Sequence, residues 1–226
     1  MAGLPSGEVT FLFTDVEGST KLWEQDAEAM HRTLARHDAL LRTAVEAHHG
    51  HLFKNIGEAF CAAFPSAQDA AQAAVAAQQA LHREVPQLRV PMALHTGRAE
   101  LRDGDYFGPA LSRVARLLVA GHGGQVLLSK ATAERIQPSL PDGARLRPLG
   151  MHRLRDLTTR ELIFQLNSPG LPSHFPPLNT LDVAFRRGAS RATLVWVVIV
   201  AVIVGLALMA YLQTLPARVL PHPVVP

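Results

Sequence analysis

Two acidic side chains stand where predicted strands end, and both have the chemistry to bind a cation. Asp15 follows a β-branched and aromatic run at residues 9–14 (VTFLFT), and a Gly-Ser-Thr turn comes next at residues 18–20. Carboxylate oxygens bind hard divalent cations, and the N–H groups at the start of a helix favour phosphate. The alternative is that Asp15 or Ser19 only caps the helix that follows.

The second acidic side chain is Glu58, in the segment KNIGEAF at residues 54–60. Predicted strands at residues 52–56 and 59–64 place it at the tip of a hairpin. Two carboxylates from neighbouring strand ends are able to share a pair of Mg²⁺ ions. A solvated acid in a turn is the alternative interpretation.

A third segment, residues 94–117, reads LHTGRAELRDGDYFGPALSRVARL. It carries Asp105 ahead of a predicted helix at residues 109–120. Ser112 and Arg116 are four residues apart on that helix, so they project from the same face.

The other elements follow from hydrophobic periodicity and from turn residues. We expect further helices at residues 20–48, 66–82 and 129–136, and further strands at residues 88–95, 98–101, 125–128 and 161–166. This order predicts an α+β fold, with helices packed against an antiparallel-rich sheet.

The three segments together resemble the class III adenylate/guanylate cyclase homology domain in its bacterial form. The resemblance extends over about residues 8–166. It implies a ferredoxin-like βαββαβ core with additions. It also implies conversion of a nucleoside triphosphate to a 3′,5′-cyclic monophosphate and pyrophosphate, with two Mg²⁺ or Mn²⁺ ions. The active sites of the family form between two domains arranged head to tail, so a homodimer would carry two sites.

The resemblance assigns a role to each matching residue. Asp15, the carbonyl of Val16 and Glu58 would hold the metal ions, while Lys54 and Asp105 would read the purine. The other assigned residues are Arg116 for the transition state, Ser112 in place of an asparagine that orients the ribose, and Gly18, Ser19, Thr20 and Arg155 for the phosphates.

The residue types favour ATP as the substrate and also point to two departures from the family pattern. A lysine donor and an aspartate acceptor match the edge of adenine, and guanine presents the opposite pattern. Glu58 is one methylene longer than the expected aspartate, and Ser112 is shorter than the expected asparagine. Both changes predict reduced activity. The alternative is a catalytically degenerate module that binds nucleotide or dimerises with another cyclase chain.

Composition and hydropathy set the wider organisation of the 226 residues. The net charge is +3, and the basic residues are not interleaved with aromatic ones, so we expect no nucleic-acid binding. The expected organisation is a cyclase domain (7–167), a Pro-rich linker with a basic flank (168–191), a transmembrane helix (192–212) and a short Pro-rich tail (213–226).

The apolar segment at residues 192–212 contains no charge and is long enough to cross a bilayer. A buried soluble helix is the alternative interpretation. Arg186, Arg187 and Arg191 precede the segment and only Arg218 follows it. The positive-inside rule then predicts a single-pass protein of the inner or plasma membrane with a cytoplasmic cyclase domain.

Overall fold

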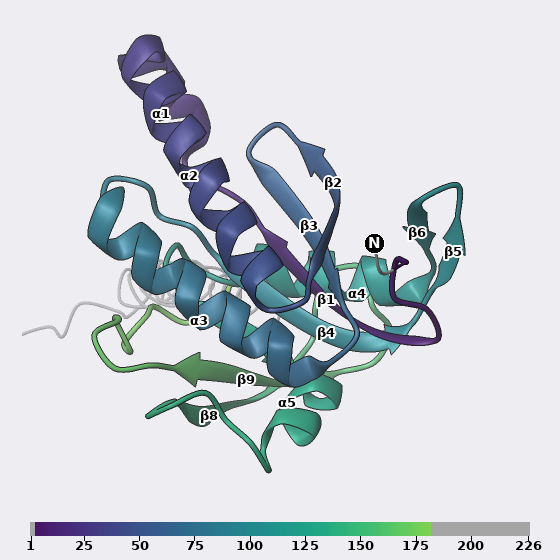
Figure 1. Cartoon of the computed structure of the whole chain (residues 1–226). Helices are drawn as coiled ribbons and strands as arrows, with labels where there is room; N and C mark the ends of the chain where they lie inside the picture. The colour runs from purple at the N-terminus through teal and green to yellow at the C-terminus, as the bar shows by residue number, and fades with distance from the viewer. Residues whose placement is uncertain (1–2, 182–226) are drawn as a thin grey trace, which may run out of the picture. The chain divides into compact units, whose positions relative to one another are not determined.

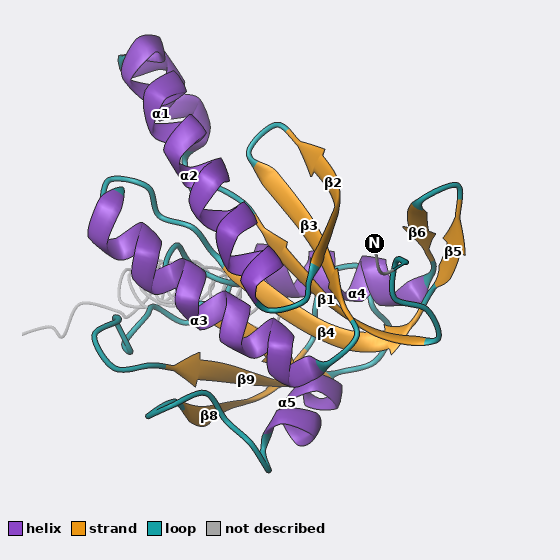
Figure 2. Cartoon of the chain, viewed as in Figure 1, coloured by secondary structure: helices purple, strands orange, loops and turns teal. Residues whose placement is uncertain are grey.

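A computed structural model describes residues 3–181 of the chain as one α+β unit built on a seven-stranded sheet (Figures 1 and 2). The strands are β1 (Glu8–Thr14), β2 (His51–Ile56), β3 (Ala59–Phe64), β4 (Met92–Arg98), β5 (Glu100–Arg102), β6 (Asp105–Phe107), β7 (Val126–Ser129), β8 (Arg145–His152) and β9 (Glu161–Asn167). The helices are α1 (Ser19–Gln25), α2 (Ala27–Ala47), α3 (Ala67–Glu84), α4 (Pro109–Ala120) and α5 (Lys130–Ile136). In the large sheet the strands follow the order β2-β3-β1-β4-β7-β9-β8, while β5 and β6 form a separate hairpin.

Strand β1 lies inside the sheet and pairs antiparallel with both β3 and β4. Its β-branched and aromatic sequence suits a position where both faces are buried. Its side chains alternate between two cores, because Phe11 belongs to one hydrophobic cluster and Leu12 to the other. The alternation fixes which way each flanking residue points.

Helices α2 and α3 cover one face of the sheet, and α4 packs on the opposite face (Figure 2). The first core brings Leu41 and Val45 of α2 and the alanine-rich side of α3 against Leu12 and Phe64. The second core packs α4 against β1 and β4, and it includes the side chain of Phe11. Small side chains let α3 approach closely, because they leave little bulk between a helix and the surface beneath it.

The βαββαβ core predicted from the sequence is present, because β1, α2, β2, β3, α3 and β4 place their strands in the order β2-β3-β1-β4. The predicted helix at residues 20–48 is divided into α1 and α2. Asp26 adopts an extended conformation there, and its side chain caps α2 by accepting from the Ala29 N–H. Strand β8 was not predicted. It contains Pro148 and Gly150, and a shift in register separates them, which a strand at the edge of a sheet tolerates.

Residues 168–181, the described part of the predicted linker segment, pack against the domain. The Asn179 N–H donates to the Ala120 carbonyl at 2.9 Å, and the Leu181 N–H donates to the Arg153 carbonyl at 3.2 Å. The Gln165 amide donates to the Ser173 carbonyl at 2.9 Å. Between residues 3 and 181 no helix is both long and apolar enough to cross a bilayer. The predicted span at residues 192–212 lies outside the described residues.

Gly50 is the last residue of the connection between α2 and β2, and the packing around its Cα leaves no room for a side chain. A Cβ there would lie 2.3 Å from the ring of Phe64 and 2.8 Å from Val45. We predict that Gly50→Ala lowers the free energy of unfolding by about 1–3 kcal/mol, because overpacking forces buried neighbours apart. Urea denaturation of the full chain measures this loss. The exposed substitution Ala47→Ser is the control, and equal stability of the two variants would contradict the packing at Gly50.

Candidate functional site

The register of the sheet brings Asp15 and Glu58 to the same end of the first three strands. Thr14 of β1 stands opposite Phe60 of β3, so Asp15 emerges beside the turn that contains Glu58. The Asp15 carboxylate accepts from the Val16 N–H at 2.9 Å. Among the described side chains none caps α1, whose N-cap is Gly18 in a left-handed conformation. The interpretation of Asp15 or Ser19 as a helix cap is therefore wrong.

Trp23 on α1 holds the second carboxylate. Its indole N–H donates to Glu58 Oε1 at 2.5 Å, and its ring packs edge-on against His31 at 4.7 Å between centroids. Glu58 is therefore an anchored side chain and not simply a solvated turn acid. Sequence reasoning missed this contact, because the two residues are 35 positions apart and no local pattern connects them.

Two buried polar atoms without partners belong to residues near this end of the sheet, Thr14 before Asp15 and His37 within electrostatic reach of both carboxylates. Within residues 3–181, Thr14 Oγ1 and His37 Nε2 are the buried side-chain atoms that have no hydrogen-bond partner. His37 on α2 packs edge-on against the ring of Phe60, and its Nδ1 lies 2.9 Å from Asp38. Burial lowers the pKa of His37, although the negative charges of Asp38, Asp15 and Glu58 partly oppose that shift. His37 is therefore neutral at neutral pH, and Asp15 and Glu58 lie close enough to act on it electrostatically.

Lys54 and Asp105, the two residues predicted to read the purine, form an ion pair. Asp105 also accepts from the Tyr106 N–H at 2.8 Å. The hydrogen bond from Lys54 is the main reason why the pKa of Asp105 is lowered. Cys61 is the register partner of Lys54, and burial raises the pKa of its thiol to about 11, so this cysteine is an unreactive part of the strand.

The two pairs of predicted site residues lie on different faces of the β2–β3 hairpin. Lys54 is the register partner of Cys61 in β3. The neighbours of Cys61 in that strand, Phe60 and Ala62, point into the core covered by α2 and α3, so Cys61 points to the opposite face. The Lys54–Asp105 pair is therefore on the α4 side. The Glu58 carboxylate turns instead toward Trp23 on α1. One chain does not bring the carboxylates and the purine-reading pair to a common point.

Helix α4 carries Ser112 and Arg116 one turn apart. Arg116 forms an ion pair with Asp156 at 2.8 Å, in the loop that follows β8. Arg155 is the neighbour of Asp156, so this contact holds the loop of the predicted phosphate-binding arginine beside α4. The sequence did not identify Asp156, because nothing local distinguishes it from a surface acid.

Glu17 holds the turn between β1 and α1 in place through contacts with Gly123 and Arg89. The Glu17 carboxylate accepts from the Gly123 N–H at 3.0 Å and lies 3.4 Å from Arg89 Nε. Its own N–H donates to the Arg89 carbonyl at 2.8 Å. These bonds position the backbone of Val16, Gly18, Ser19 and Thr20, which the sequence analysis assigned to metal and phosphate.

We predict that Lys54→Met raises the pKa of Asp105 toward the ordinary carboxyl value of about 4, since the largest cause of its depression is removed. A carboxyl group whose pKa is lower in the folded state than in the unfolded state stabilises the fold at pH values above its unfolded pKa. This stabilisation is lost as the pH falls through the folded-state pKa. Carbon-detected NMR of the Asp105 carboxyl group measures the shift. Lys130→Met, which breaks a separate pair with Glu134, is the control and leaves the pKa of Asp105 unchanged. An equal titration of Asp105 in the parent and in Lys54→Met would show that the pair does not exist in solution.

Curated relatives share much of this chain. The protein Rv0891c of Mycobacterium tuberculosis, described only as uncharacterized, is 41% identical over 178 residues, covering 78% of this chain and 61% of that protein. The chain thus spans about three fifths of the length of that relative. An adenylate cyclase of Mycosarcoma maydis is 33% identical over 162 residues, covering 59% of this chain and 6% of that protein.

A solved structure and a family model match the fold. An adenylate cyclase of Trypanosoma brucei, solved in its monomeric state, superposes with a TM-score of 0.69 at 25% identity and covers 80% of this chain and 97% of that one. Residues 3–155 match the model of the adenylate and guanylate cyclase catalytic domain. This match covers more than half of the sequence and includes all but the end of the fold described above. The chain therefore belongs to the family of adenylate and guanylate cyclase catalytic domains.

Proposed function

We propose that the chain is an adenylate cyclase that converts ATP to 3′,5′-cyclic AMP and pyrophosphate. The observation that carries the proposal is the ion pair of Lys54 and Asp105, which presents a donor and an acceptor together on one face of the hairpin. Similar proteins support ATP as the substrate, because those from Mycosarcoma maydis and Trypanosoma brucei are both described as adenylate cyclases.

The residues at the end of β1 fit a site for divalent cations. The register places Asp15 next to the turn that carries Glu58, and both carboxylates act electrostatically on His37, whose buried Nε2 has no hydrogen-bond partner. Asp15, Glu58 and the Val16 carbonyl would hold two Mg²⁺ or Mn²⁺ ions. Such ions supply charge for the phosphates and lower the pKa of the ribose 3′-hydroxyl.

The purine-reading pair distinguishes the two common bases. The Lys54 ammonium donates to a ring nitrogen of adenine, and the Asp105 carboxylate accepts from its exocyclic amine. Guanine would place a carbonyl oxygen against the carboxylate, which has no proton to donate. Binding ATP requires the two side chains to exchange some of their mutual hydrogen bonding for bonds to the base.

The reaction joins the ribose 3′-oxygen to the α-phosphorus and breaks the bond from that phosphorus to the pyrophosphate oxygen. The hydroxyl proton passes to solvent, and pyrophosphate leaves with the bonding electron pair. The Arg116 guanidinium neutralises charge that develops on the α-phosphate, while Ser112 on the same helix face contacts the ribose. Arg155 and the N–H groups of residues 18–20 bind the outer phosphates.

We propose that two chains complete each site. The carboxylates and the purine-reading pair lie on different faces of one hairpin, so a substrate that spans both must lie between two domains. A head-to-tail homodimer would join Asp15 and Glu58 of one chain to Lys54, Asp105 and Arg116 of the other, twice. A heterodimer with another cyclase chain would produce one such site.

A second candidate function is a degenerate module that binds nucleotide or pairs with an active cyclase chain. Glu58 and Ser112 favour it, because each differs in length from the residue that the family pattern expects. Production of cyclic AMP by the purified chain with Mn²⁺ and ATP separates the two functions. ATP binding and dimerisation without turnover would establish the second.

The sequence also supports a proposal about location. We infer that residues 192–212 anchor the chain in the membrane and that the arginines ahead of them keep the cyclase domain in the cytoplasm. A reporter fused after Pro226 should respond from the far side of the membrane.

We predict that Asp15→Asn lowers cyclase turnover at least about 100-fold, because a misplaced or missing metal ligand disturbs the reacting geometry. The fold should remain, since the Asp15 side chain is exposed. Turnover with Mn²⁺ and thermal unfolding are measured together. Glu24→Gln, which neutralises another exposed carboxylate nearby on α1, is the control and keeps turnover within about twofold of the parent. Full activity in Asp15→Asn would exclude the metal role.

The contact between Trp23 and Glu58 leads to a second prediction. Trp23→Phe should lower turnover about tenfold, equivalent to roughly 1.4 kcal/mol of transition-state stabilisation, because Glu58 loses the donor that orients it. In a Glu58→Asp background the same change should have little effect, since the shorter carboxylate does not reach the indole. A double-mutant cycle for turnover and for Mn²⁺ affinity measures the coupling. Equal losses in both backgrounds would mean that Trp23 acts only through packing.

A further inference from the structure

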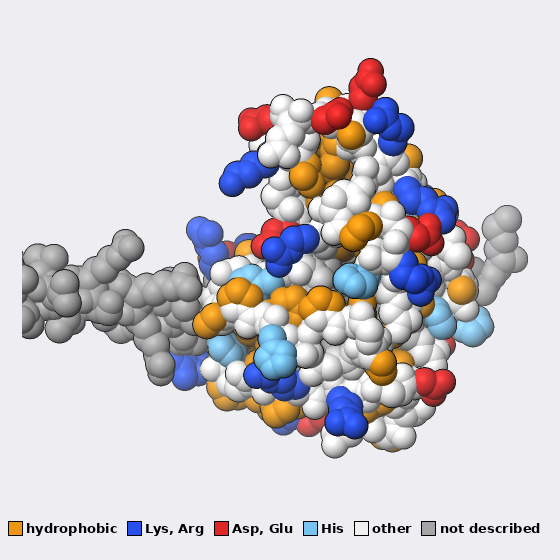
Figure 3. Space-filling view, turned by 90° about the vertical axis from the view of Figure 1, so that its left-hand side faces the viewer, with side chains coloured by type: hydrophobic (Ala, Val, Ile, Leu, Met, Phe, Trp, Pro, Cys, Tyr) orange, Lys and Arg blue, Asp and Glu red, His pale blue; other side chains and the backbone are white. Residues whose placement is uncertain are grey.

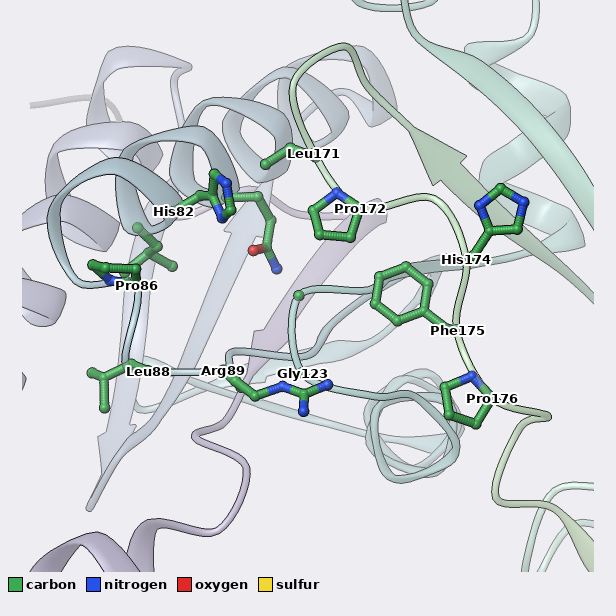
Figure 4. Close-up of a pocket in the computed structure, with 13 residues that line it drawn as sticks. His82, Pro86, Leu88, Arg89, Gly123, Leu171, Pro172, His174, Phe175 and Pro176 are labelled. Carbon is green, nitrogen blue, oxygen red and sulfur yellow. The ribbon is translucent and has the colours of Figure 1, made fainter.

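A cavity of about 320 Å³ lies between the end of α3, residues 86–89, the glycine turn at residues 123–124 and the returning segment at residues 171–176 (Figure 4). Its volume falls at the lower end of the range of small-molecule sites. The returning segment comes after residue 155, where the match to the family model ends. One wall of the cavity is therefore built by residues that lie beyond the part of the chain matched by the family model.

The lining combines an apolar wall with basic and neutral polar groups. Phe175, Pro172 and Pro176 line one side, and His82 of α3 and Arg89 lie across from them, while the ring of His174 is turned away (Figure 4). The residues that line this cavity, all in the described part of the chain, include no aspartate or glutamate. On the face seen in Figure 3, histidine and hydrophobic side chains lie side by side across the middle of the domain.

The floor of the cavity is connected directly to the turn that precedes α1. Arg89 lies 3.4 Å from the Glu17 carboxylate, and the Gly123 N–H donates to the same carboxylate at 3.0 Å. The contact is tight, because a Cβ on Gly123 would lie 2.3 Å from Arg89 Cβ and 2.5 Å from Glu17 Oε2. Glu17 stands between Val16 and Gly18, so a group that attracts Arg89 also acts on that turn.

Within residues 3–181, the Arg89 guanidinium pairs with one carboxylate, that of Glu17, and its other nitrogens have no hydrogen-bond partner there. The Glu17 oxygen lies 3.4 Å from Nε, which is longer than a good charge-assisted hydrogen bond. The Arg89 side chain is 62% exposed and lines the cavity. Arginine binds carboxylates in a planar, two-bonded geometry, and the ring of Phe175 offers a flat apolar surface nearby.

We propose that this cavity binds a small organic carboxylate with a flat apolar body, and that the bound anion competes with Glu17 for Arg89. The carboxylate pairs with Arg89 and His82, and its apolar body packs against Phe175 and the prolines of the returning segment. The turn at residues 15–20 then loses part of the contact that holds it in place. Control of cyclase turnover by such an anion rests on the proposed function, whereas binding and the change in the turn do not.

The experiment uses the full chain and benzoate as the probe. Ligand-observed NMR measures binding, and amide hydrogen exchange of residues 15–20 measures the response of the turn. Benzoate should bind saturably with a Kd of about 1 mM or below, which is what a ligand of roughly nine heavy atoms allows, and should increase exchange in the turn. Benzamide has the same shape without the charge, and inorganic phosphate has the charge without the apolar body, so both should bind at least about tenfold more weakly than benzoate.

Three variants test the residues. Arg89→Gln should weaken benzoate binding about tenfold and abolish the change in exchange. Glu17→Gln should strengthen binding several-fold, because Arg89 loses its competing partner. Arg83→Gln, which removes a charge from the same end of α3 outside the cavity, is the matched control and should bind like the parent.

Several outcomes would overturn the proposal. Absence of saturable benzoate binding, or equal binding of benzamide or phosphate, would exclude the proposed class of ligand. Equal affinities of Arg89→Gln and Arg83→Gln would place the binding elsewhere. Binding without a change in exchange at residues 15–20 would exclude the connection to the turn. All of these measurements are independent of cyclase turnover, so an inactive chain would refute the proposed function without deciding this one.

Discussion

The antiparallel pairing of β1 with β3 and β4 is the constraint on which the rest of the structure depends. Strand β1 is buried on both faces, so its register is fixed by two cores at once. A slip by one residue would exchange the side chains that face the two cores. The same slip would move Asp15 away from the turn that carries Glu58. Core packing and the placement of the acidic pair therefore have a single physical cause.

The alternation along β2 and β3 has a consequence for function. It directs Lys54 toward α4 and Asp105, while the turn directs Glu58 toward α1 and Trp23. The two groups that we propose to bind one nucleotide therefore lie on different sides of the hairpin within a chain. The site that we propose between two domains would remove this separation, because each domain would supply one of the two groups.

Much of the core and many of the candidate residues were accessible from the sequence, because the signals are local. Asp15, Glu58 and Asp105 stand in short motifs at strand boundaries, while Lys54 and Arg116 lie within a strand and a helix that the local pattern predicts. What the sequence did not reveal depends on distant or irregular contacts. The bonds from Trp23 to Glu58 and from Arg116 to Asp156 join separate elements. The edge strand β8 was hidden by a proline and a glycine, and Asp26 divided a helix whose hydrophobic pattern continues across the break.

Residues 168–181 are attached to the surface of the domain, although their proline-rich composition is typical of a linker. Four prolines prevent regular structure, yet backbone and side-chain bonds to Ala120, Arg153 and Gln165 hold the segment on the surface. It closes one wall of a cavity whose floor is Arg89, and Arg89 contacts Glu17 in the turn beside Asp15. The cavity floor and the turn are thus connected through Glu17, because its carboxylate contacts both Arg89 and the Gly123 N–H. Gly123 permits this close approach, since a Cβ at that position would collide with Arg89 and with the Glu17 carboxylate.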